Sequence, residues 1–214
     1  MRESHIAVLI IFLGTLAASL YFYPQLPDMM PSHWNWAGEV DGHLPKLWGA
    51  FLVPLVIAAV TGLLLLIPKI DPLKRNLEEF RSYYDGFIVL LAAFMGGVHF
   101  QIMLWAVGVE ISPNSTFPVG IGVLLLYTGI LLEKSKRNWF IGIRTPWTMS
   151  SDRVWEKTHG IGGVLFKIAG LVSLSCVLFP AYSVLLIVIS AILAAVFPVI
   201  YSYFEYRKEK SVRR

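Results

Sequence analysis

Residues 47–68 read LWGAFLVPLVIAAVTGLLLLIP, a run of 22 residues without a charged side chain. A helix rises about 1.5 Å per residue, so roughly 20 apolar residues span the hydrocarbon core of a bilayer. Pro54 and Gly62 lie inside the run, and both residue types are tolerated in transmembrane helices. The run therefore predicts a membrane-spanning helix.

Five further apolar runs accompany this one. They cover residues 5–23, 85–108, 117–132, 161–179 and 182–204. The first run ends in Tyr21-Phe22-Tyr23 and not in a small-residue cleavage site, which favours a retained span over a signal peptide. Hydrophobic residues make up 56% of the 214 residues, against roughly 45–50% on average. We predict an all-α, multi-pass protein of the cell membrane, with six transmembrane helices in a single domain over residues 1–214.

Basic residues are distributed unevenly between the predicted loops. Of the 18 Lys and Arg residues, 16 lie at one face, in the N-terminus, the loops 69–83 and 133–160, and the C-terminal tail. The opposite face carries Lys46, and Lys167 lies within the fifth span. Because cytoplasmic loops are enriched in Lys and Arg, both termini and the two basic loops are predicted to face the cytoplasm.

Three polar side chains interrupt the predicted spans. His99 and Gln101 lie in the middle of the third span, and Lys167 lies about 10 Å from the cytoplasmic start of the fifth. An intramembrane ionisable group is by default a functional candidate. The structural alternatives are a neutral histidine bonded across helices and a lysine that extends to the lipid headgroups.

The loop at residues 24–46, here called the outer loop, is predicted to have a fixed shape. Three prolines between residues 24 and 31 keep its first part extended, and Asp41-Gly42 is typical of a turn. Trp34 and Trp36 are expected at the membrane interface. Imidazole and carboxylate groups suit zinc, although their spacing here matches no strong zinc motif. The candidate ligands for such a metal site would be His33, Glu39, Asp41 and His43.

The loop at residues 133–160, here called the cytoplasmic loop, is the longest polar interval in the chain. Its residues 138–159 read NWFIGIRTPWTMSSDRVWEKTH. Trp155 and His159 are four residues apart and so share one helical face, and Ser151-Asp152 is typical of a helix start. Two interpretations are open. The loop either binds a partner, or anchors the protein with tryptophan at headgroup depth and Arg144 against lipid phosphates.

These residues resemble the signature of the SdpI family of membrane proteins. The positions that carry the resemblance, here called the signature residues, are Asn138, Gly142, Arg144, Thr145, Pro146, Trp147, Thr148, Trp155 and His159. The outer loop resembles the small uncharacterised domain that precedes this signature in many members, and Asp71-Pro72 with Asn76 is similar to the family's first cytoplasmic loop. The segment Gly129–Ser135 departs from the pattern because it lacks a polar start.

The resemblance implies a non-enzymatic immunity or receptor protein that binds no cofactor. Family immunity is directed against a membrane-active peptide toxin, and a toxin-bound member holds a small transcriptional repressor at the membrane. For this chain we expect the cytoplasmic loop either to recruit such a repressor or to complete the fold, and we expect no direct contact with nucleic acid. Because the shaped outer loop is expected at the membrane surface where such a peptide acts, toxin binding is predicted for its residues Pro31, His33, Trp34, Asn35, Gly38 and Asp41.

Two other classes of function stay open on the sequence. A small membrane transporter would use His99 and Lys167, and a metal-dependent membrane enzyme would use the outer-loop histidines. The chain contains no His-Glu-x-x-His, phosphate-loop or Gly-x-Ser-x-Gly motif, so no familiar enzyme class is indicated.

Overall fold

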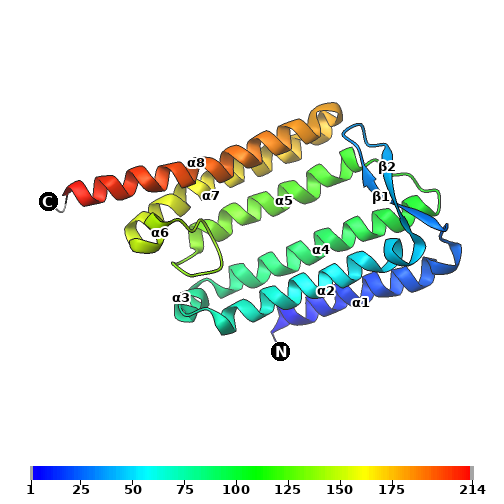
Figure 1. The fold of residues 1–214 in the computed structure, drawn as a ribbon, viewed down its shortest axis with the longest axis horizontal. Coiled ribbons are helices and arrows are strands. Elements are labelled where there is room, and N and C mark those ends of the chain that lie inside the picture. Colours follow the sequence, from blue (N-terminus) through cyan, green and yellow to red (C-terminus); the bar gives the residue numbers. More distant parts are fainter. Residues whose placement is uncertain (1, 213–214) are drawn as a thin grey trace.

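The computed structural model describes residues 2–212, and within them six helices are long and apolar enough to cross a membrane. They are α1 (Glu3–Phe22), α2 (Lys46–Ile70), α4 (Arg81–Ala106), α5 (Pro113–Lys134), α7 (Asp152–Ser175) and α8 (Ser183–Val212). The predicted class is confirmed: the chain is a multi-pass membrane protein (Figure 1). The shorter elements are α3 (Lys74–Glu79), α6 (Pro146–Ser150), the strands β1 (Met29–Trp34) and β2 (Val40–Pro45), and three 3₁₀ turns at Tyr23–Gln25, Cys176–Leu178 and Pro180–Tyr182.

The long helices form two groups that meet along one boundary. Helices α1, α2 and α4 pack together, and α5 and α8 pack on either side of α7. The main contact between the groups is that of α4 with α5, here called the seam. Figure 1 shows α4 and α5 running side by side along it.

Both ends of the described chain lie at the same end of the bundle. Figure 1 shows the N-terminus, α3, α6 and the end of α8 at that end, and the hairpin of β1 and β2 at the other. The predicted grouping of the basic loops on one face is therefore confirmed for the described residues, whereas Arg213 and Arg214 lie outside them. That this face is the cytoplasmic one remains a prediction from the charge asymmetry.

Two prolines inside α2 are accommodated by hydroxyl groups of neighbouring helices. A proline has no N–H, so the carbonyl four residues earlier loses its helical partner. The Ala50 carbonyl, four residues before Pro54, accepts a hydrogen bond of 2.6 Å from Ser19 Oγ of α1. The Leu64 carbonyl, four residues before Pro68, accepts one of 2.7 Å from Tyr84 Oη of α4. These bonds fix α2 between α1 and α4.

Helices α5 and α7 approach so closely that their backbones touch through glycines. A Cβ added to Gly163 would lie 2.8 Å from the Gly129 carbonyl oxygen, and one added to Gly170 would lie 2.8 Å from the Gly122 carbonyl oxygen. The two glycines of each helix, Gly122 and Gly129 on α5 and Gly163 and Gly170 on α7, are seven residues apart and so share one face. Small residues at such a crossing allow close van der Waals packing in a membrane.

The structure confirms one predicted helix start and adds one element. Helix α7 begins at Asp152 with Ser151 as its N-cap, as the Ser151-Asp152 pair predicts, and it continues into the apolar run that starts at residue 161. The outer loop contains a β-hairpin, so the described chain is not entirely helical. This small addition lies outside the six spans, and the helical membrane class stands.

Candidate functional site

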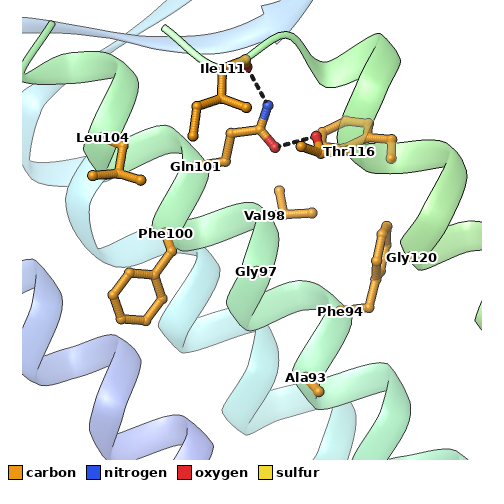
Figure 2. A pocket seen from close by; sticks show the side chains of 11 residues that line it. Ala93, Phe94, Gly97, Val98, Phe100, Gln101, Leu104, Ile111, Thr116 and Gly120 are labelled. Carbon is orange, nitrogen blue, oxygen red and sulfur yellow. Dashed lines mark hydrogen bonds between the residues drawn. The ribbon is translucent and has the colours of Figure 1, made fainter. Parts of the chain in front are cut away.

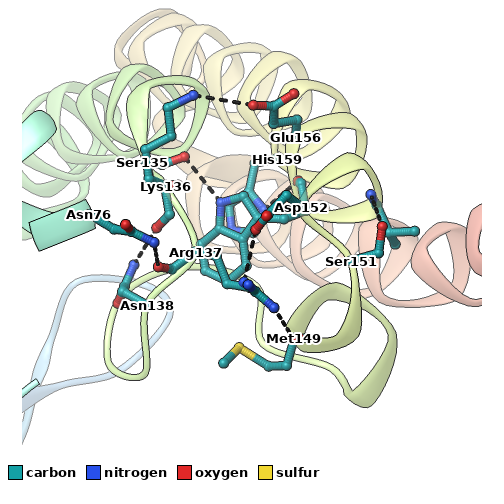
Figure 3. A network of polar contacts seen from close by, with 12 residues as sticks. Asn76, Ser135, Lys136, Arg137, Asn138, Met149, Ser151, Asp152, Glu156 and His159 are labelled. Atoms are coloured by element: carbon teal, nitrogen blue, oxygen red, sulfur yellow. Dashed lines mark hydrogen bonds and ion pairs between the residues drawn. The ribbon is translucent and has the colours of Figure 1, made fainter. Parts of the chain in front are cut away.

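Asn138 organises the first turn of the cytoplasmic loop from a fully buried position (Figure 3). Its Nδ2 donates to the carbonyl oxygens of Lys136 and Ile141, at 2.8 and 2.9 Å. Its Oδ1 accepts from the backbone N–H groups of Phe140 and Ile141, at 3.0 and 2.6 Å. The amide therefore uses two donors and two acceptors, all on backbone, and fixes the path of the loop.

Trp155 and His159 form the buried centre of the same region. Their rings stack with centroids 3.9 Å apart and an angle of 15° between planes, and each residue is 1% exposed. Trp155 Nε1 donates to the Ser135 carbonyl at 3.1 Å. The Ile143 N–H donates to His159 Nε2 at 2.9 Å, so Nδ1 of His159 carries the proton and donates to the Trp155 carbonyl at 2.8 Å. His159 is thus held as one neutral tautomer.

Gly142 occupies the only backbone conformation that lets the loop pass over this pair. Its φ is +111°, which L side chains rarely adopt, and an added Cβ would collide with the His159 ring. The glycine in the signature is therefore explained by contact with the histidine of the same signature.

Thr145 and Thr148 begin helix α6 with a reciprocal cap. The side chain of Thr145 accepts from the Thr148 N–H at 3.1 Å, and Thr148 Oγ1 accepts from the Thr145 N–H at 2.9 Å. Pro146 occupies the first turn, where its missing N–H costs nothing. The helix is joined to α8 by a contact of 3.0 Å between Thr145 Oγ1 and Ser202 Oγ, and by an edge-to-face contact of Trp147 with Tyr203.

Other polar contacts connect this assembly to the rest of the molecule. Asp71, at the end of α2, accepts from the Trp139 N–H at 3.0 Å, and Asn76 of α3 donates to the Arg137 carbonyl at 2.7 Å. These two contacts cross from the first helix group to the second. Ser151, the N-cap of α7, donates to Glu209 of α8 at 2.6 Å. The cytoplasmic loop therefore joins both helix groups at one end of the bundle (Figure 3).

The burial of the signature residues corrects one expectation. Trp155 and His159 were expected to present a face to a partner or to the membrane surface, but both are enclosed by the loop that precedes them. The exposed signature residues are Arg144 and Pro146. Arg144 donates to the Trp139 carbonyl, and Trp139 itself is 54% exposed. Trp139, Phe140 and Arg144 are thus among the exposed residues of this loop.

At the opposite end of the bundle, the hairpin and the end of α4 enclose a cleft of about 530 Å³. Pro31 and Gly38, two of the predicted outer-loop residues, line it. Glu39 and Glu110 provide its carboxylates and Trp105 an aromatic wall. Trp34 packs edge-to-face on Trp105, with ring centroids 5.4 Å apart, and so positions the hairpin over α4.

The remaining predicted outer-loop residues shape the hairpin. His33 Nδ1 and Asp41 Oδ1 lie 2.5 Å apart on opposite strands, both exposed and neither lining the cleft. Asn35 Oδ1 accepts from the N–H groups of Ala37 and Glu39 and closes the turn. The tip is attached to α5 by Asn114 Nδ2, which donates to the Trp36 carbonyl at 3.1 Å. Within residues 2–212 no three His, Cys, Asp or Glu side chains are grouped to hold a metal, so the arrangement gives no support to the zinc alternative.

The intramembrane polar residues lie in separate places. His99 is fully buried and contacts Ser19 Oγ at 3.0 Å, within two turns of the outer end of α4. Lys167 forms an ion pair of 2.5 Å with Glu133 of α5, so its amine has a protein partner as well as access to headgroups. His99 belongs to the first helix group and Lys167 to the second, so the structure does not bring these two residues together.

Gln101 lies on the seam, at the outer end of a cavity of about 380 Å³ between α4 and α5 (Figure 2). Its Nε2 donates to the Ile111 carbonyl at 2.8 Å, and its Oε1 accepts from Thr116 Oγ1 at 2.7 Å. Gln101 therefore holds the loop between the two helices, and the rest of the cavity wall is apolar.

Comparison with known proteins tests the resemblance drawn from the sequence. Residues 134–202 match the sequence profile of the SdpI/YfhL protein family. These residues are an SdpI/YfhL family region, and the resemblance is confirmed. Residues 10–58 match a domain of unknown function, DUF1648. The chain is also similar to Immunity protein SdpI of Bacillus subtilis (strain 168), with 23% identity over 97% of this chain and 98% of that protein. No solved structure matches the chain.

Several contacts that complete the assembly were not predicted from the sequence. Asp71 and Asn76 stood out in the sequence through their resemblance to the family's first cytoplasmic loop, but their contacts with the signature could not be derived from spacing. Glu133 and Glu209 carry no local signal at all. The matched relative is named as an immunity protein and not as an enzyme.

Proposed function

We propose that this protein gives immunity against a membrane-active peptide toxin, and that the toxin is recognised in the cleft between the hairpin and the end of α4. The cleft is the observation that carries the proposal, since it combines an apolar wall with carboxylates at the surface where such a peptide meets the membrane. The full-length similarity to an immunity protein supports the same function.

The charges around the cleft favour a cationic peptide segment. The outer end of the molecule has four acidic residues and, apart from histidines, one basic residue, Lys46. The acidic residues are Asp28, Glu39, Asp41 and Glu110. Glu39 and Glu110 line the cleft together with Trp105, whose ring face attracts a cation. Complementary charge would raise the rate of encounter and exclude anionic peptides.

Expression in a toxin-sensitive Bacillus strain that lacks its own immunity gene tests the proposal. The double variant Glu39→Gln/Glu110→Gln should increase toxin sensitivity about tenfold, since two partly exposed charge contacts contribute about 0.7 kcal/mol each. Asp28→Asn, an exposed acid that does not line the cleft, is the matched control and should protect like the wild type. Full protection by the double variant at equal membrane abundance would contradict the proposed site.

We further propose that the exposed surface of Trp139, Phe140 and Arg144 recruits a small cytoplasmic repressor. Exposure of two aromatic side chains beside an arginine supports this role, because such residues dominate protein interfaces. Trp139→Ala and Arg144→Gln should abolish reporter induction while immunity and abundance persist. Trp155→Ala, which removes a buried ring, should instead lower abundance and both functions together. Loss of abundance in all three variants would remove the case for recruitment.

A further inference from the structure

The ends of α1 and α2 that lie beside the N-terminus enclose a cavity of about 430 Å³. Its apolar lining residues, here called the floor, are Leu65, Leu66 and Pro68. Its polar lining residues, here called the rim, are mostly basic, namely Arg2, His5, Lys69 and Arg81 with the acid Glu78. An apolar floor with a basic rim is the arrangement that a phospholipid fits, with its acyl chain on the floor and its phosphate at the rim.

Part of the rim charge is already neutralised within the protein. Arg2 pairs with Glu78 at 3.1 Å and with Asp85 at 3.2 Å, and its hydrogen bond to Glu78 raises the pKa of Arg2. Arg81 pairs with Asp85 at 2.7 Å and with Glu78 at 3.4 Å. These two cations and two anions balance, so they close the inner side of the cavity without leaving a free charge.

Two rim groups are left without a partner. Within residues 2–212, Lys69 has no carboxylate within ion-pair distance. His5 Nε2 is buried and has no hydrogen-bond partner among the described residues. A buried polar nitrogen without a partner destabilises the folded protein, and an oxygen-rich anion in the cavity would provide that partner. Lys69 and His5 would therefore both be satisfied by an anionic ligand with several oxygen atoms.

We propose that this cavity binds one anionic glycerophospholipid of the membrane leaflet at that end. Lys69 and His5 hold the phosphate, and one acyl chain lies along Leu65 and Leu66. Leu66 is about half exposed on the outside of the bundle, as are Ile6 and Leu63 on the same two helices, so the acyl chain continues into the bilayer without a step. The leaflet is the cytoplasmic one in the orientation that the basic residues predict, and that leaflet is rich in anionic lipid.

Native mass spectrometry of the full-length protein, in detergent with phosphatidylglycerol and phosphatidylcholine of identical chains, tests the site. Wild type should retain one phosphatidylglycerol in preference to phosphatidylcholine. Lys69→Gln should lower that retention about fivefold, the effect of one cation near an anionic surface, and His5→Leu should lower it as well. Lys69→Arg should restore it. Lys74→Gln removes an exposed charge in α3 that does not line the cavity, and it should leave retention unchanged.

Three results would overturn the proposal. The first is equal retention of the two lipids by wild type. The second is an equal loss in Lys69→Gln and Lys74→Gln, which would indicate general surface charge. The third is complete displacement of the lipid by millimolar inorganic phosphate, which would indicate an anion site that does not use the apolar floor. Because the readout is lipid retention, none of these outcomes depends on toxin immunity.

Discussion

Replacement of Asn138 by alanine should destabilise the protein by about 2–4 kcal/mol. The amide makes four hydrogen bonds to backbone groups, between 2.6 and 3.0 Å, from a residue that is 0% exposed. A typical net contribution is about 1 kcal/mol for each bond, and a buried group left unpaired costs about 1–3 kcal/mol. Some of the freed groups will find water as the loop relaxes, so the estimate lies below the sum of the individual penalties.

The free energy of unfolding of purified protein in mixed micelles, followed by tryptophan fluorescence, measures this loss. Asn138→Asp is an informative second variant, because it keeps the acceptor Oδ1 but places a carboxylate oxygen against the carbonyls of Lys136 and Ile141. It should be at least as destabilising as alanine. Arg153→Gln, an exposed change in the same region, should stay within about 0.5 kcal/mol of wild type. An Asn138→Ala protein as stable as Arg153→Gln would refute the account of the loop given above.

Two further predictions concern the membrane arrangement. In a Cys176→Ala background, single cysteines at the exposed positions Ser150 and Ser115 should react with an impermeant thiol reagent from opposite sides of the membrane. Labelling of both cysteines from outside the cell would contradict the predicted topology. Gly163→Ala should lower the free energy of unfolding by about 1–3 kcal/mol, because its Cβ would meet the Gly129 carbonyl. Gly14→Ala is the control and should have little effect, since nothing lies within 4 Å of the added Cβ. Equal stability of the two variants would contradict the close α5–α7 crossing.

Hydropathy and charge predicted the membrane architecture because they act over whole segments. A run such as 47–68 is long and apolar enough to predict a spanning helix without knowledge of its neighbours. Likewise, the number of Lys and Arg residues is counted over entire loops and does not depend on tertiary contacts. The start of α7 was predicted from the capping pattern of Ser151-Asp152, but the burial of Trp155 and His159 in its first turns was not predicted. Their burial depends on the cytoplasmic loop folding over them, which is a tertiary event that segment hydropathy does not register.

The hairpin was missed for a related reason. Its strands, Met29–Trp34 and Val40–Pro45, each contain a proline. The first shows no regular alternation, and the alternation of half-buried and exposed positions in the second runs through a glycine and ends in a proline. They are fixed instead by contacts outside the loop, namely Trp34 on Trp105 and Asn114 on the Trp36 carbonyl. The sequence correctly predicted a shaped loop, but the partners that shape it lie about 70 or more residues away in the chain, where spacing carries no information.

Polar contacts join the two helix groups at both ends of the seam between α4 and α5. At one end it is bridged by the bonds of Asp71 and Asn76 to the cytoplasmic loop, and at the other by Gln101 and by the attachment of the hairpin tip to Asn114. Between these polar bridges, α4 and α5 pack through apolar contacts such as Phe94 on Phe117 and border an apolar cavity, so the polar links between the two helix groups lie at the ends where the candidate sites are. A change in a buried signature residue therefore loosens the joint between the groups, and its effect on immunity is no sign of direct toxin contact. Exposed residues such as Glu110 and Trp139 are the positions at which binding and stability can be separated.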